Sequence, residues 1–157
     1  MSNSFQFLAL PAERFAPLFD RSDAELRAIG AQLMVADAKP GFPCRVSLAD
    51  AEIGDIVLLL HFTHHDVASP YRSSGPIFVR RRAATAQPAV GEIPPLLASR
   101  TLSLRAYDES AMMIGAEVVE GGDLEMAIRR QFADPRASYL HVHNARPGCF
   151  NCRVERA

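Results

Sequence analysis

The chain has 157 residues, of which 48% are hydrophobic and 22% are charged, with a formal net charge of −1 at pH 7 and a mean hydropathy of zero. These values are typical of a soluble globular protein with one domain, and they exclude a disordered chain or a strongly basic nucleic-acid-binding protein. The longest apolar run, Ile56 to Leu60, is far below the roughly 18 residues that a membrane span needs, so no membrane association is expected.

The cysteines also indicate the cellular compartment in which the protein is expected to lie. Cys44, Cys149 and Cys152 are the three in the chain, and no secretory signal accompanies them. Reduced thiols and a cytoplasmic location are therefore the expectation, and a structural disulfide between Cys44 and Cys149 is the alternative.

The N-terminal third combines a short strand with helices. Phe5 to Leu10 has the composition of a strand, and Pro11 then opens a helix that extends to Phe19. Ser22 followed three residues later by Glu25 forms a capping-box pattern, which predicts a helix from Asp23 to Gly30.

Extended segments dominate the next part of the chain. Leu33 to Ala36 leads toward a turn at Pro40-Gly41, and Cys44 to Leu48 resumes an extended segment. Asp55 to Thr63 is a further predicted strand. Its run Ile56 to Leu60 has no polar alternation, which indicates a central strand covered on both faces.

Two prolines and a glycine mark Ser69 to Pro76 as a fixed loop before a strand from Ile77 to Arg82. Ala83 to Pro95 is a polar, proline-rich connection on the surface. Thr101 to Tyr107 then alternates, with every second residue apolar, and Met112 to Val119 is its natural hairpin partner.

The C-terminal part contains one helix and two strands. Leu124, Ile128 and Phe132 lie at helical spacing after Asp123, a predicted N-cap, and Asp134-Pro135 ends the helix. The last strands are Tyr139 to His143 and Asn151 to Glu155. The predicted fold is α+β: a single domain over residues 1–157 with a largely antiparallel sheet of about seven short strands and two or three helices.

Two phrases hold most of the residues capable of site chemistry. They are Pro40-Gly41-Phe42-Pro43-Cys44-Arg45 and His141-Val142-His143-Asn144-Ala145-Arg146-Pro147-Gly148-Cys149-Phe150. Each places a Pro-Gly turn beside a cysteine and an arginine. Together they indicate where a site lies but match no motif with a known mechanism.

The second phrase adds two histidines. His141 and His143 are two residues apart, so in a strand their side chains leave from the same face, while Leu140 and Val142 point to the core. Such a pair can bind a metal or move a proton, or it can be hydrogen-bonded and structural. A metal would need a third ligand, which Cys149, Cys44 or His64 could supply only through the tertiary structure.

Cys149 is also a candidate nucleophile, with His141 or His143 as its base and Asn144 as the orienting group. Its spacing to Cys152 is formally C-x-x-C. Strand-like residues surround the motif, however, and a thioredoxin-like role needs a helix N-terminus there.

A third polar group is the loop Tyr71-Arg72-Ser73-Ser74-Gly75, whose guanidinium and hydroxyls could hold a carboxylate or phosphate. The alternative is a structural turn in which Arg72 pairs with Asp66. His64-His65-Asp66 just before it is equally consistent with a solvated loop.

Several of these phrases together resemble DUF1203, a bacterial family of unknown function. The phrases are the two above, Ser69-Pro70-Tyr71-Arg72-Ser73-Ser74-Gly75-Pro76-Ile77-Phe78-Val79-Arg80, and Leu102-Ser103-Leu104-Arg105-Ala106-Tyr107-Asp108. The resemblance implies a bacterial single-domain protein and carries no established activity, cofactor or site residue.

The leading hypothesis is one pocket that binds a small anionic molecule and that also has the residue types for catalysis. Its predicted ligand-binding residues are Arg45, Tyr71, Arg72, Ser73, Ser74 and Asn144, and its predicted catalytic residues are His141, His143 and Cys149. The alternatives are a metal-binding protein that uses His141 and His143, and a non-catalytic structural or interaction protein. The cofactor, the reaction and the oligomeric state, a homo-oligomer included, stay open.

Overall fold

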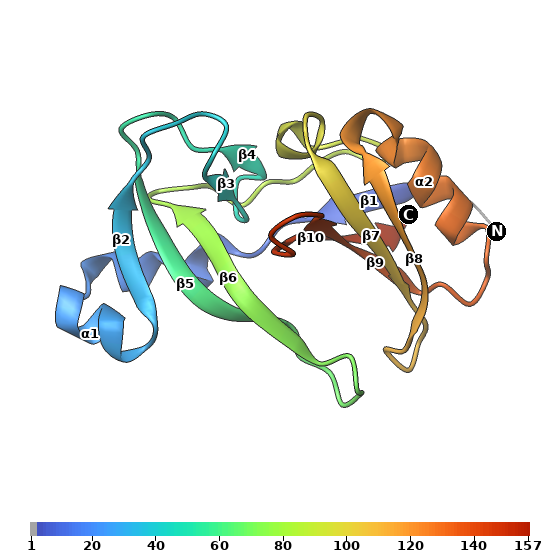
Figure 1. Cartoon of the computed structure of the whole chain (residues 1–157), viewed down its shortest axis with the longest axis horizontal. Helices are drawn as coiled ribbons and strands as arrows, with labels where there is room; N and C mark the ends of the chain where they lie inside the picture. The colour runs from blue at the N-terminus through green and yellow to red at the C-terminus, as the bar shows by residue number, and fades with distance from the viewer. Residues whose placement is uncertain (1–2) are drawn as a thin grey trace.

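The computed structural model describes residues 3–157, which form ten strands in two five-stranded sheets (Figure 1). Sheet A has the strand order β1-β10-β9-β7-β8, and sheet B has the order β2-β5-β6-β3-β4. All strand pairs are antiparallel except β3 with β6. The strands are β1 (Phe5–Leu8), β2 (Ala31–Val35), β3 (Pro43–Cys44), β4 (Ala49–Asp50), β5 (Ile56–His65), β6 (Ser73–Arg80), β7 (Thr101–Tyr107), β8 (Met113–Glu120), β9 (Tyr139–Asn144) and β10 (Phe150–Arg156).

Helices are few and short. The α-helices are α1 (Asp23–Ala28) and α2 (Leu124–Phe132), and the 3-10 helices are Ala12–Arg14, Ala16–Asp20, Pro95–Leu97 and Gly121–Asp123. The α+β class with mainly antiparallel pairing is confirmed. The expected sheet of about seven strands is corrected to ten strands in two sheets, because short pairings such as β3 with β4 have no signal of their own in the sequence.

The helix starts are partly as predicted. The capping box of α1 is present: the Glu25 backbone N–H donates to Ser22 Oγ at 3.2 Å, and the Ser22 N–H donates to the Glu25 carboxylate at 3.3 Å. Asp123, in contrast, makes no side-chain cap for α2. The single helix predicted from Pro11 to Phe19 is two 3-10 helices instead.

Two strand predictions are wrong in an informative way. The extended segment expected from Cys44 to Leu48 ends at Cys44, because the chain turns there and Leu48 adopts a φ of 53°. The loop expected from Ser69 to Pro76 ends at Arg72, because Ser73 to Pro76 form the first half of β6. Pro76 lies opposite His61 of β5, and its half of β6 pairs with β5 alone, so no ladder partner on its other side needs the missing N–H.

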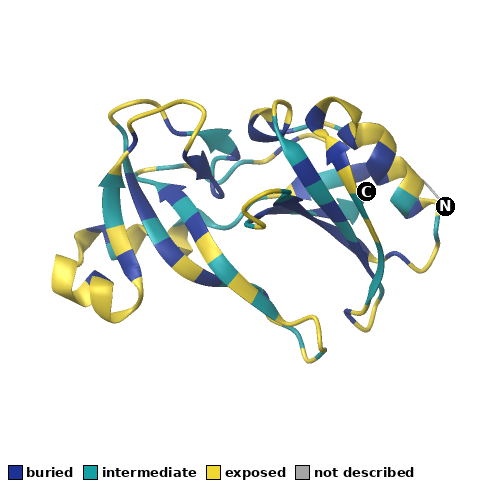
Figure 2. Cartoon of the chain, viewed as in Figure 1, coloured by how far each residue is buried: buried dark blue, intermediate teal, exposed yellow. Residues whose placement is uncertain are grey.

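Each sheet has a main hydrophobic core on one face, and sheet B has a second, smaller cluster formed by Ala36, Phe42, Ala51 and Val57. As the alternation predicted, β7 and β9 send Leu102, Leu104, Leu140 and Val142 into the core of sheet A, where they pack with Ile128 of α2. Sheet B packs the same way against α1 and the N-terminal 3-10 helices. The residues of β9 that point away from the core of sheet A, His141 and His143 among them, are buried as well, so β9 is dark blue along most of its length (Figure 2).

That second face of sheet A lies toward sheet B. β6 contacts β10 across the junction, and the end of β5 brings His64 against β9 and β10. Polar side chains are therefore buried between the sheets rather than exposed. Within residues 3–157, no helix has the length and apolar character to cross a membrane.

Candidate functional site

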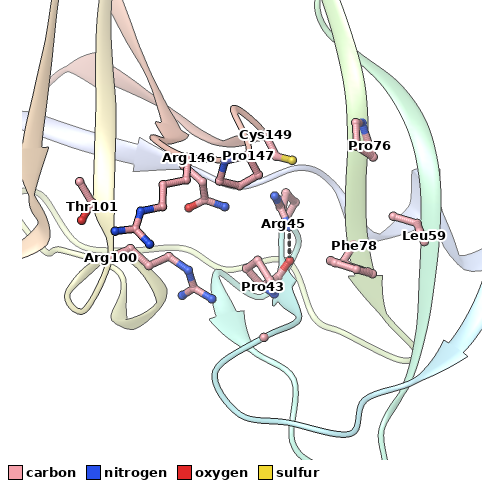
Figure 3. A pocket seen from close by; sticks show the side chains of 12 residues that line it. Pro43, Arg45, Leu59, Pro76, Phe78, Arg100, Thr101, Arg146, Pro147 and Cys149 are labelled. Atoms are coloured by element: carbon pink, nitrogen blue, oxygen red, sulfur yellow. Dashed lines mark hydrogen bonds between the residues drawn. The ribbon is translucent and has the colours of Figure 1, made fainter.

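A cavity of about 660 Å³ lies between the two sheets (Figure 3). Sheet B and its connections contribute the first phrase, and the β9–β10 loop contributes the second. The structure thus places both Pro-Gly phrases on one cavity, although about a hundred residues of chain separate them. The lining residues are Gly41, Pro43, Arg45, Leu59, Pro76, Phe78, Arg100, Thr101, Asn144, Arg146, Pro147 and Cys149.

Arg45 is the most unusual of these residues because it is only 1% exposed. Its Nε donates to the Phe150 carbonyl at 2.7 Å and a terminal nitrogen donates to the Pro43 carbonyl at 2.5 Å. No carboxylate among the described residues forms an ion pair with it. Burial lowers its pKa to about 10, so the guanidinium keeps its positive charge at neutral pH.

Two further arginines line the same cavity. Arg100 forms a two-pronged ion pair with Asp50, at 2.6 and 2.9 Å, whereas Arg146 is exposed and forms no ion pair among the described residues. None of the described residues that line the cavity is acidic, so its wall is positively charged. The sequence reasoning missed Arg100, Thr101 and Arg146. Of these, only Arg146 had a signal, its place in the second phrase.

The three cysteines have different environments. Cys44 Sγ accepts the backbone N–H groups of Ser47 at 3.4 Å and Arg80 at 3.2 Å, and Cys152 lies in the core of sheet A. Burial raises the pKa of the Cys152 thiol, which disfavours the reactive thiolate. Cys149 alone lines the cavity. All three are free, so the alternative of a Cys44–Cys149 disulfide is wrong.

The residues of the predicted loop from Tyr71 to Gly75 lie in two different places. Tyr71 and Arg72 lie outside the large cavity, and Arg72 pairs with Asp66 at 3.0 Å on the surface. Ser73, Ser74 and Gly75 line a second cavity of about 160 Å³ with His64, Arg105 and His143. The two cavities are neighbours, because Pro76, Pro147 and Cys149 line both.

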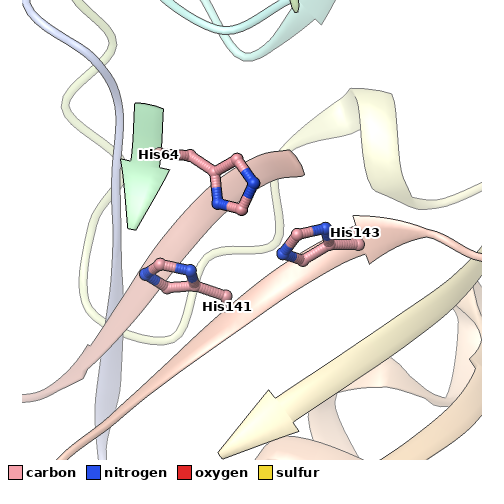
Figure 4. Close-up of side chains that lie close together, drawn as sticks. All are labelled: His64, His141 and His143. Carbon is pink, nitrogen blue, oxygen red and sulfur yellow. The ribbon is translucent and has the colours of Figure 1, made fainter. Parts of the chain in front are cut away.

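Three histidines gather beside this second cavity (Figure 4). His141 and His143 are 2% and 1% exposed on β9, and half-buried His64 approaches them from the end of β5. One ring nitrogen of each lies within 4.8 Å of one nitrogen of each of the others. His64 therefore does not lie in a solvated loop, which was the alternative that its sequence context had allowed.

Burial keeps these imidazoles neutral. It lowers the pKa of His141 to about 2, that of His143 to about 3 and that of His64 to about 4, and neighbouring histidines and arginines add to the effect. Arg153, opposite His141 on β10, adds to the effect at His141, and Arg105, opposite His141 on β7, adds to it at His64 and His143. Neutral imidazoles can accept a hydrogen bond or ligate a metal.

Irregularities in the strands produce this arrangement. The pairing of β5 with β6 shifts register between Phe62 and His65, and the pairing of β10 with β9 shifts between Phe150 and Cys152. A β-bulge changes the direction of the side chains that follow it. His64 therefore leaves the face that carries Phe62 into the core of sheet B and stacks on Phe150 of sheet A.

His65 differs from the three clustered histidines because both of its nitrogens are occupied. Its Nδ1–H donates to the Tyr71 carbonyl at 2.8 Å, and the Tyr139 hydroxyl donates to Nε2 at 2.6 Å. A carbonyl oxygen can only accept a hydrogen bond, so the proton of neutral His65 is on Nδ1. Its role is to join the end of β5 to β9.

The comparisons with known proteins concern most of this architecture. No curated protein and no solved structure matches the chain. A family model described as "Protein of unknown function (DUF1203)" matches residues 41–156, which include the second phrase, all of the first phrase except Pro40, the three clustered histidines and the whole lining of the large cavity. The chain therefore belongs to the DUF1203 family.

Proposed function

We propose that the protein binds a small anionic molecule in the cavity between sheets A and B. The observation that carries this proposal is Arg45, a buried guanidinium with no carboxylate partner that lines the cavity wall. Burying a charge without a counter-charge is costly, and such sites are commonly completed by a ligand. An anion in the cavity would supply the missing charge.

The other lining groups suit the same ligand. Arg146 adds a second unpaired cation, and Thr101 and Asn144 add polar groups of the kind that orient a bound molecule. The volume of about 660 Å³ is within the range of small-molecule sites. Leu59, Pro76 and Phe78 line part of the wall, so the ligand would combine an acidic group with an apolar part.

Arg146→Ala tests the proposal with little risk to the fold, because this side chain is exposed on the β9–β10 loop. We expect phosphate, pyrophosphate, succinate or citrate, screened at constant ionic strength, to raise the melting temperature of the wild type by several degrees. An anion at a hundred times its Kd adds about 2.7 kcal/mol to the free energy of unfolding. The variant should show less than half of that shift.

The matched control is Arg72→Ala, which also removes one exposed arginine but lies outside the cavity. Its response to each anion should equal that of the wild type. Equal shifts in all three proteins would mean that the anions act through general ionic effects. That outcome, or the absence of a shift in the wild type, would contradict the proposal.

A further inference from the structure

The three clustered histidines share a feature that hydrogen bonding does not explain. Nδ1 of His64, Nδ1 of His141 and Nε2 of His143 are buried, and none has a hydrogen-bond partner among the described residues. Buried polar atoms in folded proteins are almost always paired, so three unpaired ones in adjacent side chains require an explanation. The anion cavity does not provide it, because none of the three histidines lines that cavity.

The hydrogen bond of His143 shows what its unpaired nitrogen can do. Nδ1 of His143 lies 2.9 Å from the Gly148 carbonyl, which can only accept. Nδ1 therefore carries the proton, and Nε2 presents a lone pair. A histidine that donates its other N–H to a backbone carbonyl is the usual arrangement of a metal ligand.

The rings are also held in place. His64 stacks on Phe150 with ring centroids 5.1 Å apart and an interplanar angle of 4°, and its ring meets that of His143 edge-on at 5.0 Å. His141 contacts the edge of the same Phe150 ring at 5.0 Å. His143 also meets Phe150, with ring centroids 5.7 Å apart and an interplanar angle of 77°, so Phe150 contacts all three imidazoles.

We propose that His64, His141 and His143 together bind one divalent transition-metal ion of the zinc class. Three imidazoles are a known ligand set for zinc in sites that keep a fourth coordination position open. Of the three candidates that the sequence left open for the third ligand, this proposal takes His64 and not Cys44 or Cys149. It does not depend on the anion-binding proposal.

The geometry requires only a local adjustment. Tetrahedral zinc at about 2.0–2.1 Å from nitrogen places its ligand nitrogens roughly 3.3 Å apart. In this structure one ring nitrogen of each histidine lies within 4.8 Å of one ring nitrogen of each of the others, and side-chain rotation can close the difference. The ion is then reached from the cavity of about 160 Å³, which His64 and His143 line.

The charges nearby specify the fourth ligand. No carboxylate belongs to the cluster, and Arg105 lines the small cavity beside it. Three neutral imidazoles leave the double charge of the ion uncompensated, so an anion or hydroxide is favoured at the open position. Cys149 lines both cavities, which places this position next to the proposed anion site.

The test is zinc binding to untagged, metal-stripped protein, measured by competition with a chromophoric chelator. We expect one zinc ion per chain in the wild type. His64→Gln should weaken binding by more than about 100-fold, because loss of a ligand costs more than loss of a second-shell partner. Zinc should also raise the melting temperature of the wild type but not that of His64→Gln.

His61→Gln is the matched control, since His61 is on the same strand but exposed and outside the cluster. It should bind zinc as the wild type does, and so should Arg146→Ala, whose histidines are intact. His64 is only half-buried, so the metal-free His64→Gln protein should fold, which circular dichroism would verify. Wild type that takes up no stoichiometric zinc, or His64→Gln that binds it equally well, would overturn the proposal.

Discussion

Phe150 connects the two candidate sites within a single residue. Its backbone carbonyl accepts the Arg45 Nε–H at 2.7 Å on the side of the anion cavity, and its ring stacks on His64 on the side of the histidine cluster. The register shift that follows Phe150 in β10 separates its pairing from that of Cys152, which belongs to the core of sheet A. Phe150 can thus serve both cavities, while Cys152 on the other side of the register shift stabilises the fold.

The hydrogen bond between Tyr139 and His65 gives a prediction at the same scale. Tyr139→Phe removes the donor to Nε2 of His65, which is 2% exposed and cannot turn to water. Leaving a buried acceptor unpaired costs about 1–3 kcal/mol. We expect a loss of that size in the free energy of unfolding from urea denaturation, with zinc affinity unchanged because neither residue belongs to the cluster.

Tyr71→Phe serves as the comparison. The Tyr71 hydroxyl makes no hydrogen bond among the described residues, and the side chain is 37% exposed. Its removal should change the free energy of unfolding by less than about 0.5 kcal/mol. If Tyr139→Phe were as stable as Tyr71→Phe, the Tyr139–His65 hydrogen bond would contribute nothing measurable to the free energy of unfolding.

At the scale of elements, the sequence correctly predicts which side chains enter the core in strands that alternate between apolar and polar residues. The alternation in β7 and β9 correctly assigned Leu102, Leu104, Leu140 and Val142 to the core, because a period of two in side-chain direction is a local property. The same argument placed His141 and His143 on one face. The capping box at Ser22 is equally local and is confirmed.

Elements that depend on distant partners could not be predicted in this way. Ser73 to Pro76 has the composition of a loop and becomes a strand only because β5 pairs with it. His64 seemed to belong to a polar loop, and the bulge that directs it toward Phe150 exists only within the β5–β6 pairing. Non-local pairing overrides local propensity in both cases.

The β9–β10 loop supports a prediction about Gly148. This residue has a φ of 81°, and a Cβ added there would meet no atom within 4 Å, so Gly148→Ala introduces backbone strain without a clash. The strain costs about 1 kcal/mol and shifts the carbonyl that orients His143. Zinc affinity in the competition assay should fall by roughly 10-fold or more.

Gly91→Ala provides a control with the same backbone strain. Gly91 has a φ of 79°, has open space at its Cβ position and lines neither cavity. It should lose a similar amount of stability while its zinc affinity stays at the wild-type value. Equal zinc affinities in the two variants would show that the Gly148 carbonyl does not position His143.

At the scale of the whole molecule, both candidate sites lie at the junction of two sheets, each of which has its own hydrophobic core. The sequence indicated that the two phrases belong to one site, since each combines Pro-Gly with cysteine and arginine. It offered no means of placing Arg100, which lies outside both phrases and lines the cavity because the 3-10 helix Pro95–Leu97, just before β7, contacts β4. The two sheets are therefore joined by side-chain contacts that no short sequence motif encodes.

Arg100 and Asp50 form the strongest of these contacts. Their guanidinium and carboxylate lie 2.6 Å apart, with side chains only 16% and 11% exposed, and they join β4 of sheet B to the start of β7 in sheet A. Asp50→Asn leaves Arg100 without its counter-charge. Because the pair is largely buried, we expect the free energy of unfolding to drop by about 2–4 kcal/mol in urea denaturation.

The same substitution should strengthen anion binding, because it releases a third cation on the cavity wall. The melting-temperature shift produced by the best anion in the screen should therefore be larger in Asp50→Asn than in the wild type, although the ligand-free protein melts lower. Asp66→Asn breaks the exposed Arg72–Asp66 pair outside the cavity and should cost less than about 1 kcal/mol with an unchanged anion response. An anion shift that decreased in Asp50→Asn while the protein remained folded would mean that Arg100 does not face the bound anion and that the cavity's charge is set by Arg45 and Arg146 alone.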